Sequence, residues 1–182
     1  LQIPLLGEHQ AKNCALALAV CMDVMEDLYR KPKTFSMPAV RNNLSMLHWP
    51  GRMEVLRFDP FVLLDACINS ASCENVKEVL RHLGISNCTV IVGIPEDKDY
   101  AGVVRSMKDV AARIILTRSG NPHYHFSQHQ REVLMQEGIL TEWTDSVKQA
   151  LNLANSFSDA IVILGTTSVI SETEQYILLM NL

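Results

Sequence analysis

The spacing of hydrophobic positions changes near residue 50 of this chain. Before that point, residues 7–29 are rich in Ala, Leu and Met, and apolar side chains recur about once per helical turn. This spacing predicts a helix buried on at least one face. A shorter helix is expected from Ser36, as N-cap ahead of Pro38, to about Leu47, and WPGR at 49–52 predicts a turn.

After residue 52, short apolar runs alternate with segments of helical periodicity. Regular alternation of this kind is typical of a Rossmann-like α/β fold, with a mostly parallel six-stranded sheet and helices on both faces. We place a domain boundary at about residue 49. The predicted strands are 53–58, 61–66, 89–94, 113–117, 140–143 and 160–165, and the predicted helices are 73–83, 99–111, 127–137, 145–156 and 168–180.

The composition restricts the class of protein. The chain is 48% hydrophobic and 20% charged, as in globular proteins, and its net charge of -4 gives no general field for nucleic acid or an anionic membrane. No apolar stretch reaches the ~20 residues of a membrane span. The five cysteines form no C-x-x-C and resemble reduced core thiols, which favours the cytoplasm. The opening LQIPLLGEHQ lacks an initiator Met, so we expect a piece of a longer chain.

Four loops follow predicted strands: DACINS, GIPEDKD, TRSGNPHYH and GTTS. Ligands of open α/β sheets bind outside the carboxyl ends of the strands, so these loops are the expected site. Asp65, at the end of an apolar run, either caps the following helix or holds a ligand. In the second loop we expect Asp99 to cap the next helix and Lys98 to be free for an anionic ligand, beside Asp97; solvated surface charges are the alternative.

Several common motifs are missing from the sequence. The chain contains no G-x-x-x-x-G-K-[ST], G-x-G-x-x-G, G-x-S-x-G or H-E-x-x-H, so it is not expected to hold a triphosphate by itself. His123, His125 and His129 have no cysteine or carboxylate at ligand spacing. A polar loop leading into a helix capped by Ser127 is the better interpretation of this stretch.

Five stretches, in order, carry a family resemblance: GEHQAKNCALA, WPGRMEVL, VLLDACINSAS, VGIPEDKD and DAIVILGTTSVISE. They resemble the patterns G-x-H-Q-x-x-N-A, P-G-R-x-E, D-G-A-H-N-P, D-K-D and G-S-L-Y-L-V-G of folylpolyglutamate synthase and dihydrofolate synthase, within the Mur ligase superfamily. The resemblance implies that residues 1–48 are the helical tail of a central ATP-binding domain. Residues 49–182 would then be the C-terminal, glutamate ligase domain.

The resemblance also implies a reaction. ATP phosphorylates the carboxylate of a folate or dihydropteroate, and the amine of L-glutamate attacks the acyl phosphate to form an amide. The central domain would bind most of the ATP and Mg²⁺, so this fragment would be inactive alone. It would pack on its own central domain through the helix over 7–29, and without that domain the helix favours self-association.

Particular residues acquire roles by the same resemblance. Asn13 would meet the adenine, Arg52 would reach the ATP phosphates, and Asp65 would bind the nucleotide. The residues expected near the glutamate or the phosphate are Asn69, Ser72, Asp97, Lys98, Asp99 and Thr166.

The chain also departs from the family patterns. Ile68 stands where the family has a histidine, and His123 stands where an arginine usually follows the proline. In the last pattern Thr166, Ser168 and Ser171 replace serine, tyrosine and glycine. Two alternatives therefore stay open: a non-catalytic binding module derived from this family, or another Mur-type amide ligase.

Overall fold

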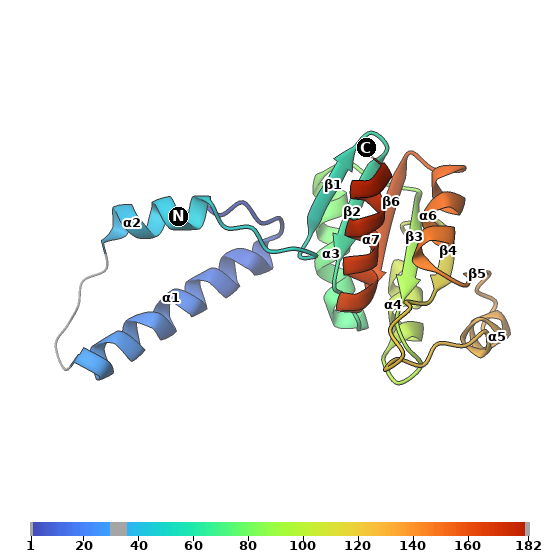
Figure 1. The fold of residues 1–182 in the computed structure, drawn as a ribbon, viewed down its shortest axis with the longest axis horizontal. Helices are drawn as coiled ribbons and strands as arrows, with labels where there is room; N and C mark the ends of the chain where they lie inside the picture. Colours follow the sequence, from blue (N-terminus) through green and yellow to red (C-terminus); the bar gives the residue numbers. More distant parts are fainter. Residues whose placement is uncertain (1, 30–35, 181–182) are drawn as a thin grey trace. The chain divides into compact units, whose positions relative to one another are not determined.

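The computed structural model describes residues 2–29 and 36–180 and divides into two compact units, Leu1–Trp49 and Pro50–Leu182. The first unit contains helices α1 (Glu8–Tyr29) and α2 (Met37–Ser45) (Figure 1). Ser36 is the N-cap of α2, as predicted, because its hydroxyl accepts a hydrogen bond from the Ala39 N–H at 3.4 Å. The two helices expected before the sheet are therefore present.

The second unit is a six-stranded sheet in the order β1-β2-β6-β3-β4-β5. Strands β2, β6, β3, β4 and β5 run parallel, and the edge strand β1 runs antiparallel to β2. The predicted mostly parallel sheet is confirmed. Its elements are β1 (Glu54–Phe58), β2 (Phe61–Asp65), α3 (Ser70–His82), β3 (Cys88–Gly93), α4 (Tyr100–Met107), β4 (Ala111–Thr117), α5 (His129–Gln136), β5 (Glu142–Thr144), α6 (Val147–Asn155), β6 (Ala160–Gly165) and α7 (Thr167–Met180).

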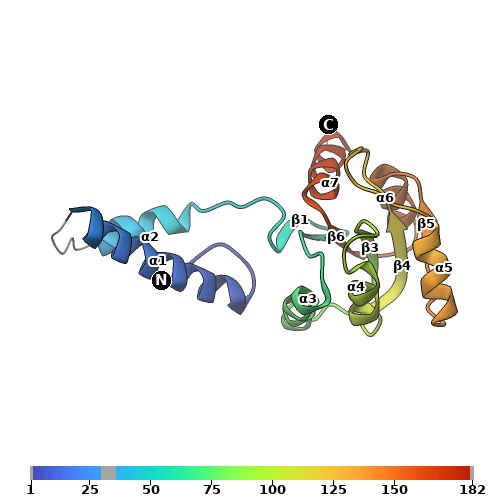
Figure 2. The ribbon, with the colours of Figure 1, turned by 90° about the horizontal axis from the view of Figure 1, so that it is seen from below.

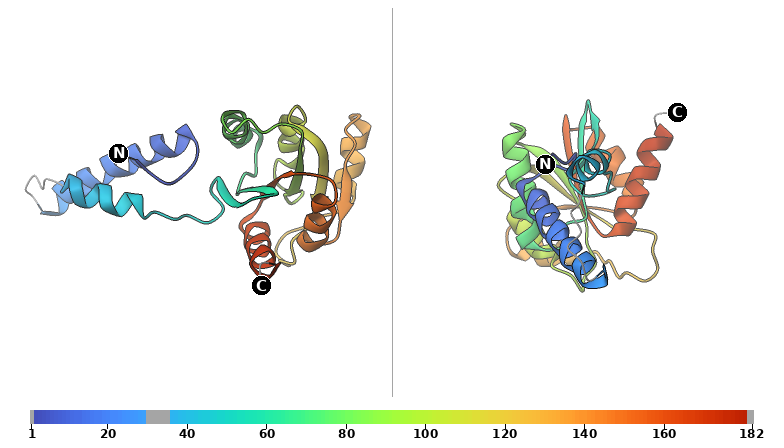
Figure 3. Two further views of the ribbon diagram at one scale, coloured as in Figure 1. Left: turned by 90° about the horizontal axis from the view of Figure 1, so that it is seen from above. Right: turned by 90° about the vertical axis from the view of Figure 1, so that its left-hand side faces the viewer.

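Helices cover both faces of the sheet. Figure 2 shows α3 and α4 on one side of the strands and α6 and α7 on the other, and the view from above in Figure 3 agrees. Strand β6 lies between β2 and β3 but leads into α7, on the face opposite α3 and α4. The chain therefore leaves neighbouring strands in opposite directions at this point. Such a point is called a topological switch point. In open α/β sheets it opens a crevice in which ligands bind.

The central strands form the core. Their apolar side chains are almost completely buried, as expected for strands covered on both faces. The carboxyl ends of β3 and β6 approach closely because both strands end in glycine: a Cβ on Gly165 would lie 2.5 Å from the carbonyl oxygen of Gly93. The Thr166 N–H donates to that same oxygen at 3.2 Å.

Two helix boundaries differ from the prediction by three residues or more. Helix α3 begins at Ser70, not at residue 73, because Asn69 caps it. Helix α4 ends at Met107, not at residue 111, because residues 108–110 form a turn and Ala111 begins β4. The Cys88 N–H donates to the Val110 carbonyl at 3.1 Å, and Ala111 pairs with Cys88.

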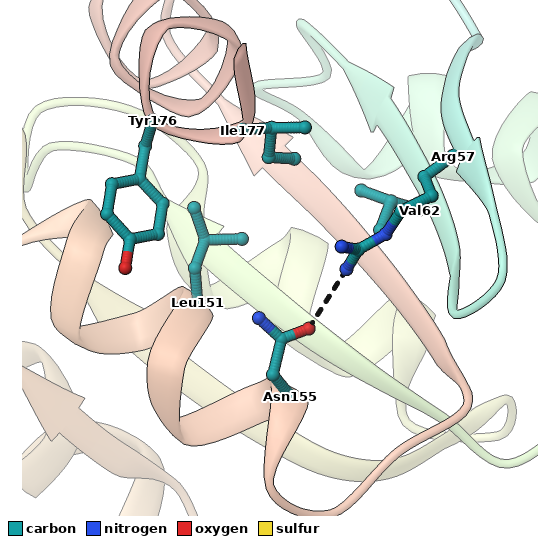
Figure 4. A pocket seen from close by; sticks show the side chains of 6 residues that line it. All are labelled: Arg57, Val62, Leu151, Asn155, Tyr176 and Ile177. Carbon is teal, nitrogen blue, oxygen red and sulfur yellow. Dashed lines mark hydrogen bonds between the residues drawn. The ribbon is translucent and has the colours of Figure 1, made fainter. Parts of the chain in front are cut away.

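A small pocket lies at the amino edge of the sheet, between the β1–β2 hairpin and helices α6 and α7 (Figure 4). The Arg57 guanidinium closes it by donating to the Asn155 side-chain oxygen at 3.2 Å. Its volume of about 10 Å³ is at the lower limit for holding one water molecule. It is a packing gap between elements and lies at the edge opposite the predicted site.

None of the helices within 2–29 and 36–180 has the length and apolar character needed to cross a bilayer.

Candidate functional site

Asp65 and Arg52 are brought together at the carboxyl end of β2. Asp65 is 6% exposed, and its Oδ2 accepts a hydrogen bond from the Met53 N–H at 2.9 Å. The Ala66 N–H donates to the Gly51 carbonyl at 2.8 Å. These two bonds tie the turn at 51–53 to the end of β2. They therefore hold the backbone of Arg52 next to that of Asp65, while the Arg52 side chain is exposed.

The turn that carries Arg52 depends on glycine. Gly51 has a φ of +64°, a conformation that side chains rarely adopt. A Cβ there would also lie 2.4 Å from Cγ2 of Ile170 in α7. The P-G-R segment therefore fits closely against the helix that follows β6, which places Arg52 next to the crevice.

Asp65 does not cap the next helix, so that alternative is wrong. Asn69 caps α3 instead: its Oδ1 accepts from the Ser72 N–H at 2.9 Å and from the Ser72 hydroxyl at 3.1 Å. Both residues were expected near the glutamate or the phosphate. Their observed contacts stabilise the first turn of α3, which follows the carboxyl end of β2.

The second loop contains one cap and one ion pair. Asp99 caps α4, as predicted, because its Oδ1 accepts from the Gly102 N–H at 3.0 Å. The ammonium of Lys98 lies 3.1 Å from Oδ2 of Asp97, and both side chains are exposed. The expectation that Lys98 is free was wrong, because its neighbour supplies an anion. An anionic ligand would have to compete with Asp97 for Lys98.

Asp99 also reaches the first loop. Its Oδ2 accepts a hydrogen bond from the Ser70 N–H at 2.9 Å. This bond is the main cause that lowers the pKa of the Asp99 carboxyl below its ordinary value of 3.8, with smaller contributions from the Gly102 N–H and the positive charge of Arg105. Asp99 is therefore ionised at neutral pH and connects two loops of the site.

Thr166 stands at the carboxyl end of β6, immediately before α7. It is 6% exposed, and its hydroxyl has no hydrogen-bond partner within the described residues. Buried hydroxyls without partners are uncommon, which makes this one a candidate contact for a ligand. The ends of β2, β3 and β6 thus bring six of the predicted residues to one edge of the sheet, around the switch point: Asp65, Asn69, Asp97, Lys98, Asp99 and Thr166. Asn13 lies in the other unit, where its amide donates to the Gln10 side chain at 3.2 Å.

The third loop, expected to be part of the site, forms a hollow in which no residue was assigned a binding role from the sequence. The hollow has a volume of about 530 Å³ and lies at the carboxyl ends of β4 and β5. Ser119 lines it, is 7% exposed, and has a hydroxyl with no partner in the described part of the chain. Glu172 and Ser168 of α7 hold the loop by bonds to the Gly120 N–H and the Asn121 amide, both at 2.8 Å. The S-G-N-P run was the available signal, because such runs form exposed turns.

The three histidines of this region do not converge. His123 and His125 line a neighbouring open hollow with Glu96 and Asp97, whereas His129 begins α5 and its Nδ1 lies 3.1 Å from the Glu132 carboxylate. Across residues 2–29 and 36–180, no three His, Cys, Asp or Glu side chains are grouped so as to hold a metal ion.

Comparisons with known proteins agree with this fold. Residues 51–167 match the family model "Mur ligase, glutamate ligase domain". A probable bifunctional folylpolyglutamate synthase/dihydropteroate synthase of Haloferax volcanii is 28% identical over 94% of this chain and 20% of its own length. The folylpolyglutamate synthase of Lacticaseibacillus casei is 25% identical over 98% of this chain and 40% of its own length.

A solved structure gives the same result. Mycobacterium tuberculosis folylpolyglutamate synthase complexed with ADP superimposes with a TM-score of 0.77 and 25% identity, over 97% of this chain and 41% of that one. The chain thus spans less than half the length of the relatives it matches. A family match over most of the sheet, together with a relative of the same fold across nearly the whole chain, shows that this chain belongs to the Mur ligase family through its glutamate ligase domain.

Proposed function

We propose that this chain is the C-terminal part of an ATP-dependent ligase that joins glutamate to a folate or dihydropteroate through an acyl phosphate. The observation that carries the proposal is the fixed pairing of the Arg52 turn with the buried Asp65 at the switch point of the sheet. A guanidinium is suited to phosphate, and a carboxylate at a strand end is suited to ribose hydroxyls. The names of the relatives supply the reaction.

The nucleotide would be shared between this chain and the rest of the ligase. Arg52 would reach the ATP phosphates, Asp65 the nucleotide, and Asn13 the adenine. The described residues do not by themselves suit Mg²⁺, because no group of three or more His, Cys, Asp or Glu side chains is placed to hold it. We therefore assign the metal and most triphosphate contacts to the region that the longer relatives have and this chain does not span.

Glutamate would enter beside the ends of β3 and β6. Lys98 is the nearest candidate for one of its carboxylates, with Asp97 as the competing anion. The hydroxyl of Thr166 and the N-terminal turn of α3, with Asn69 and Ser72, would face the phosphoryl group. Water must be kept out of such a site, because an acyl phosphate hydrolyses readily, so closure over the crevice would be part of catalysis.

Helix α1 supports the assignment of residues 1–48 to a larger domain. Five of its large apolar side chains are about half or more exposed: Leu16, Val20, Met22, Val24 and Leu28. We infer that these side chains pack on the rest of the ligase, and that they make residues 1–182 self-associate when they are expressed alone. A cytoplasmic location, where folate, ATP and glutamate meet, belongs to the same proposal.

The alternatives rest on Ile68, which cannot donate a hydrogen bond where the family places a histidine. A non-catalytic module would keep the fold and lose turnover. Another Mur-type amide ligase would keep turnover with a different acid or amine.

The deciding experiment uses the full-length protein that carries this chain. It is incubated with ATP, Mg²⁺, glutamate and either dihydropteroate or a reduced folate, and products are followed by mass spectrometry. The expected result is a product with added glutamate and release of ADP, reduced in Arg52→Ala and unchanged in Arg81→Ala, an exposed arginine at the end of α3. A folded protein that gives no amide with either acid contradicts the proposal and leaves the two alternatives, the non-catalytic module and a Mur-type ligase for another acid or amine.

A further inference from the structure

The carboxylate of Asp99 contacts two different helices. Its Oδ1 accepts from the Gly102 N–H at 3.0 Å, in the first turn of α4, and its Oδ2 accepts from the Ser70 N–H at 2.9 Å, at the first residue of α3. Ser70 follows the loop from β2, and Asp99 ends the loop from β3. One side chain therefore joins the two loops that flank β6 at the switch point.

Gly102 leaves the room that this contact needs. A Cβ at position 102 would lie 2.3 Å from both carboxylate oxygens of Asp99. Glycine lowers the stability of a helix interior by about 1 kcal/mol relative to alanine. Its presence in the first turn of α4 is therefore explained by the place of the carboxylate.

A direct role as a ligand for the carboxylates of glutamate or for a phosphate does not fit Asp99. Both of its oxygens already accept hydrogen bonds from backbone N–H groups. Its pKa is lowered, so it carries a negative charge at neutral pH and would repel a carboxylate or a phosphate. Its contacts act on neighbouring backbone.

We propose that Asp99 is a positioning residue that fixes the loop 66–69 against the end of β3 through Ser70. That loop follows Asp65, the last residue of β2, and carries Ile68 and Asn69, so its position determines where the proposed nucleotide-binding end of β2 lies relative to the end of β3. The effect on catalysis rests on the proposed ligase function, whereas the effect on the loop does not.

Substitution by serine separates the two contacts of Asp99. Asp99→Ser keeps a good N-cap for Gly102 but is too short to reach Ser70, and Asp99→Ala removes both contacts. Gly102→Ala keeps the charge and forces the carboxylate to move. Ser158→Ala is the matched control, because Ser158 also bonds backbone atoms, those of Ala160, but at the opposite edge of the sheet.

Hydrogen exchange of the full-length protein tests the loop. Exchange of the Ser70 amide is expected to rise at least about tenfold in Asp99→Ser and Gly102→Ala, as a lost hydrogen bond of about 1.4 kcal/mol would give. The Gly102 amide should stay protected in Asp99→Ser and lose protection in Asp99→Ala. A Ser70 amide that remains protected in Asp99→Ser, or that is equally exposed in Ser158→Ala, overturns the proposal.

Kinetics then test the consequence. Asp99→Ser is expected to raise the KM for ATP about tenfold, with a smaller change in kcat, while Ser158→Ala changes neither. A protein without ligase activity would still give the exchange result, so failure of the function and failure of the positioning role are distinguishable. Faster exchange with an unchanged KM for ATP in an active ligase would refute the catalytic consequence.

Discussion

The buried carboxylate of Asp65, at the end of β2, accepts a hydrogen bond of 2.9 Å from the backbone N–H of Met53, the residue before the antiparallel strand β1. Met53 has a φ of +48°, which is unusual for a residue with a side chain. The bond stabilises this conformation and sets the position of the preceding residue, Arg52. A residue predicted to bind nucleotide thus also maintains the turn that presents its neighbour.

Asp65 and Arg52 should respond differently to substitution. Asp65→Ala leaves the buried Met53 N–H without this partner and is expected to cost about 1–3 kcal/mol of unfolding free energy. It is also expected to weaken the binding of ATP. Arg52→Ala should leave the melting temperature unchanged and cost about 2–4 kcal/mol of transition-state stabilisation, measured as kcat/KM for ATP. Unchanged kinetics in Arg52→Ala, with Arg81→Ala as control, would remove it from the site.

Lys98 and Asp97 should have opposite effects on glutamate. Lys98→Ala is expected to raise the KM for glutamate, because it removes a cation near the end of β3. Asp97→Asn is expected to lower that KM, because it releases Lys98 from the ion pair at 3.1 Å. Both side chains are exposed, so neither variant should shift the thermal melt. Equal effects of the two variants on the KM would contradict this assignment.

Replacing Ile68 by histidine restores the family pattern in the loop after β2. If the rest of the site is complete, Ile68→His should increase kcat severalfold, since a ring N–H would again face the phosphates. Single-turnover measurement of ADP formation separates this effect from product release. No gain, in a variant with an unchanged melt, would favour the non-catalytic alternative.

The five thiols should fall into two classes of reactivity. Cys21 is exposed and Cys14 is partly exposed, whereas Cys67, Cys73 and Cys88 are buried. Burial raises the pKa of Cys88 to about 11, and the hydrogen bond with Cys67, 3.5 Å away, together with burial raises that of Cys73 well above its usual range. A thiol-exchange reagent should label Cys21 and Cys14 in the native chain and the other three only in denaturant, as counted by mass spectrometry.

Asp99 should make stability depend on pH in the acid range. Its folded pKa lies below 3.8, so its hydrogen bonds stabilise the fold above that value and are lost as the pH falls through the folded pKa. The difference in unfolding free energy between wild type and Asp99→Ser should therefore be constant from pH 7 to about 5 and shrink below pH 3.8. A difference that stays constant down to pH 2, in urea titrations, would show that the charge is not involved.

Local patterns predicted the elements but not all of their contacts. The strand over 160–165 matches β6 residue for residue, because a short apolar run between polar segments has one clear reading. The predicted end of α4 was wrong because residues 108–110 form a turn and Ala111 already belongs to β4, where it pairs with Cys88, a partner that no local pattern contains.

The candidate site shows the same division. The cap by Asp99 was predictable from its place before α4, whereas its bond to Ser70 joins residues 29 apart. The contact between Asp65 and Met53 depends on the pairing of Glu54 with Leu64 in the sheet. The sequence places the charge of Asp97 next to Lys98, but it does not give the distance between the carboxylate and the ammonium. Tertiary contacts decided each of these outcomes.

The position of β6 has a consequence for synthesis on the ribosome. This strand is the last of the sheet to be made, yet β2 and β3 share no hydrogen-bonded edge except through it. Until Ala160–Gly165 has left the exit tunnel, the growing chain holds a β1–β2 hairpin and a separate β3–β4–β5 group, each with one open apolar edge. A premature stop between residues 145 and 159 thus yields two unjoined half-sheets, and it exposes the product to aggregation and proteolysis.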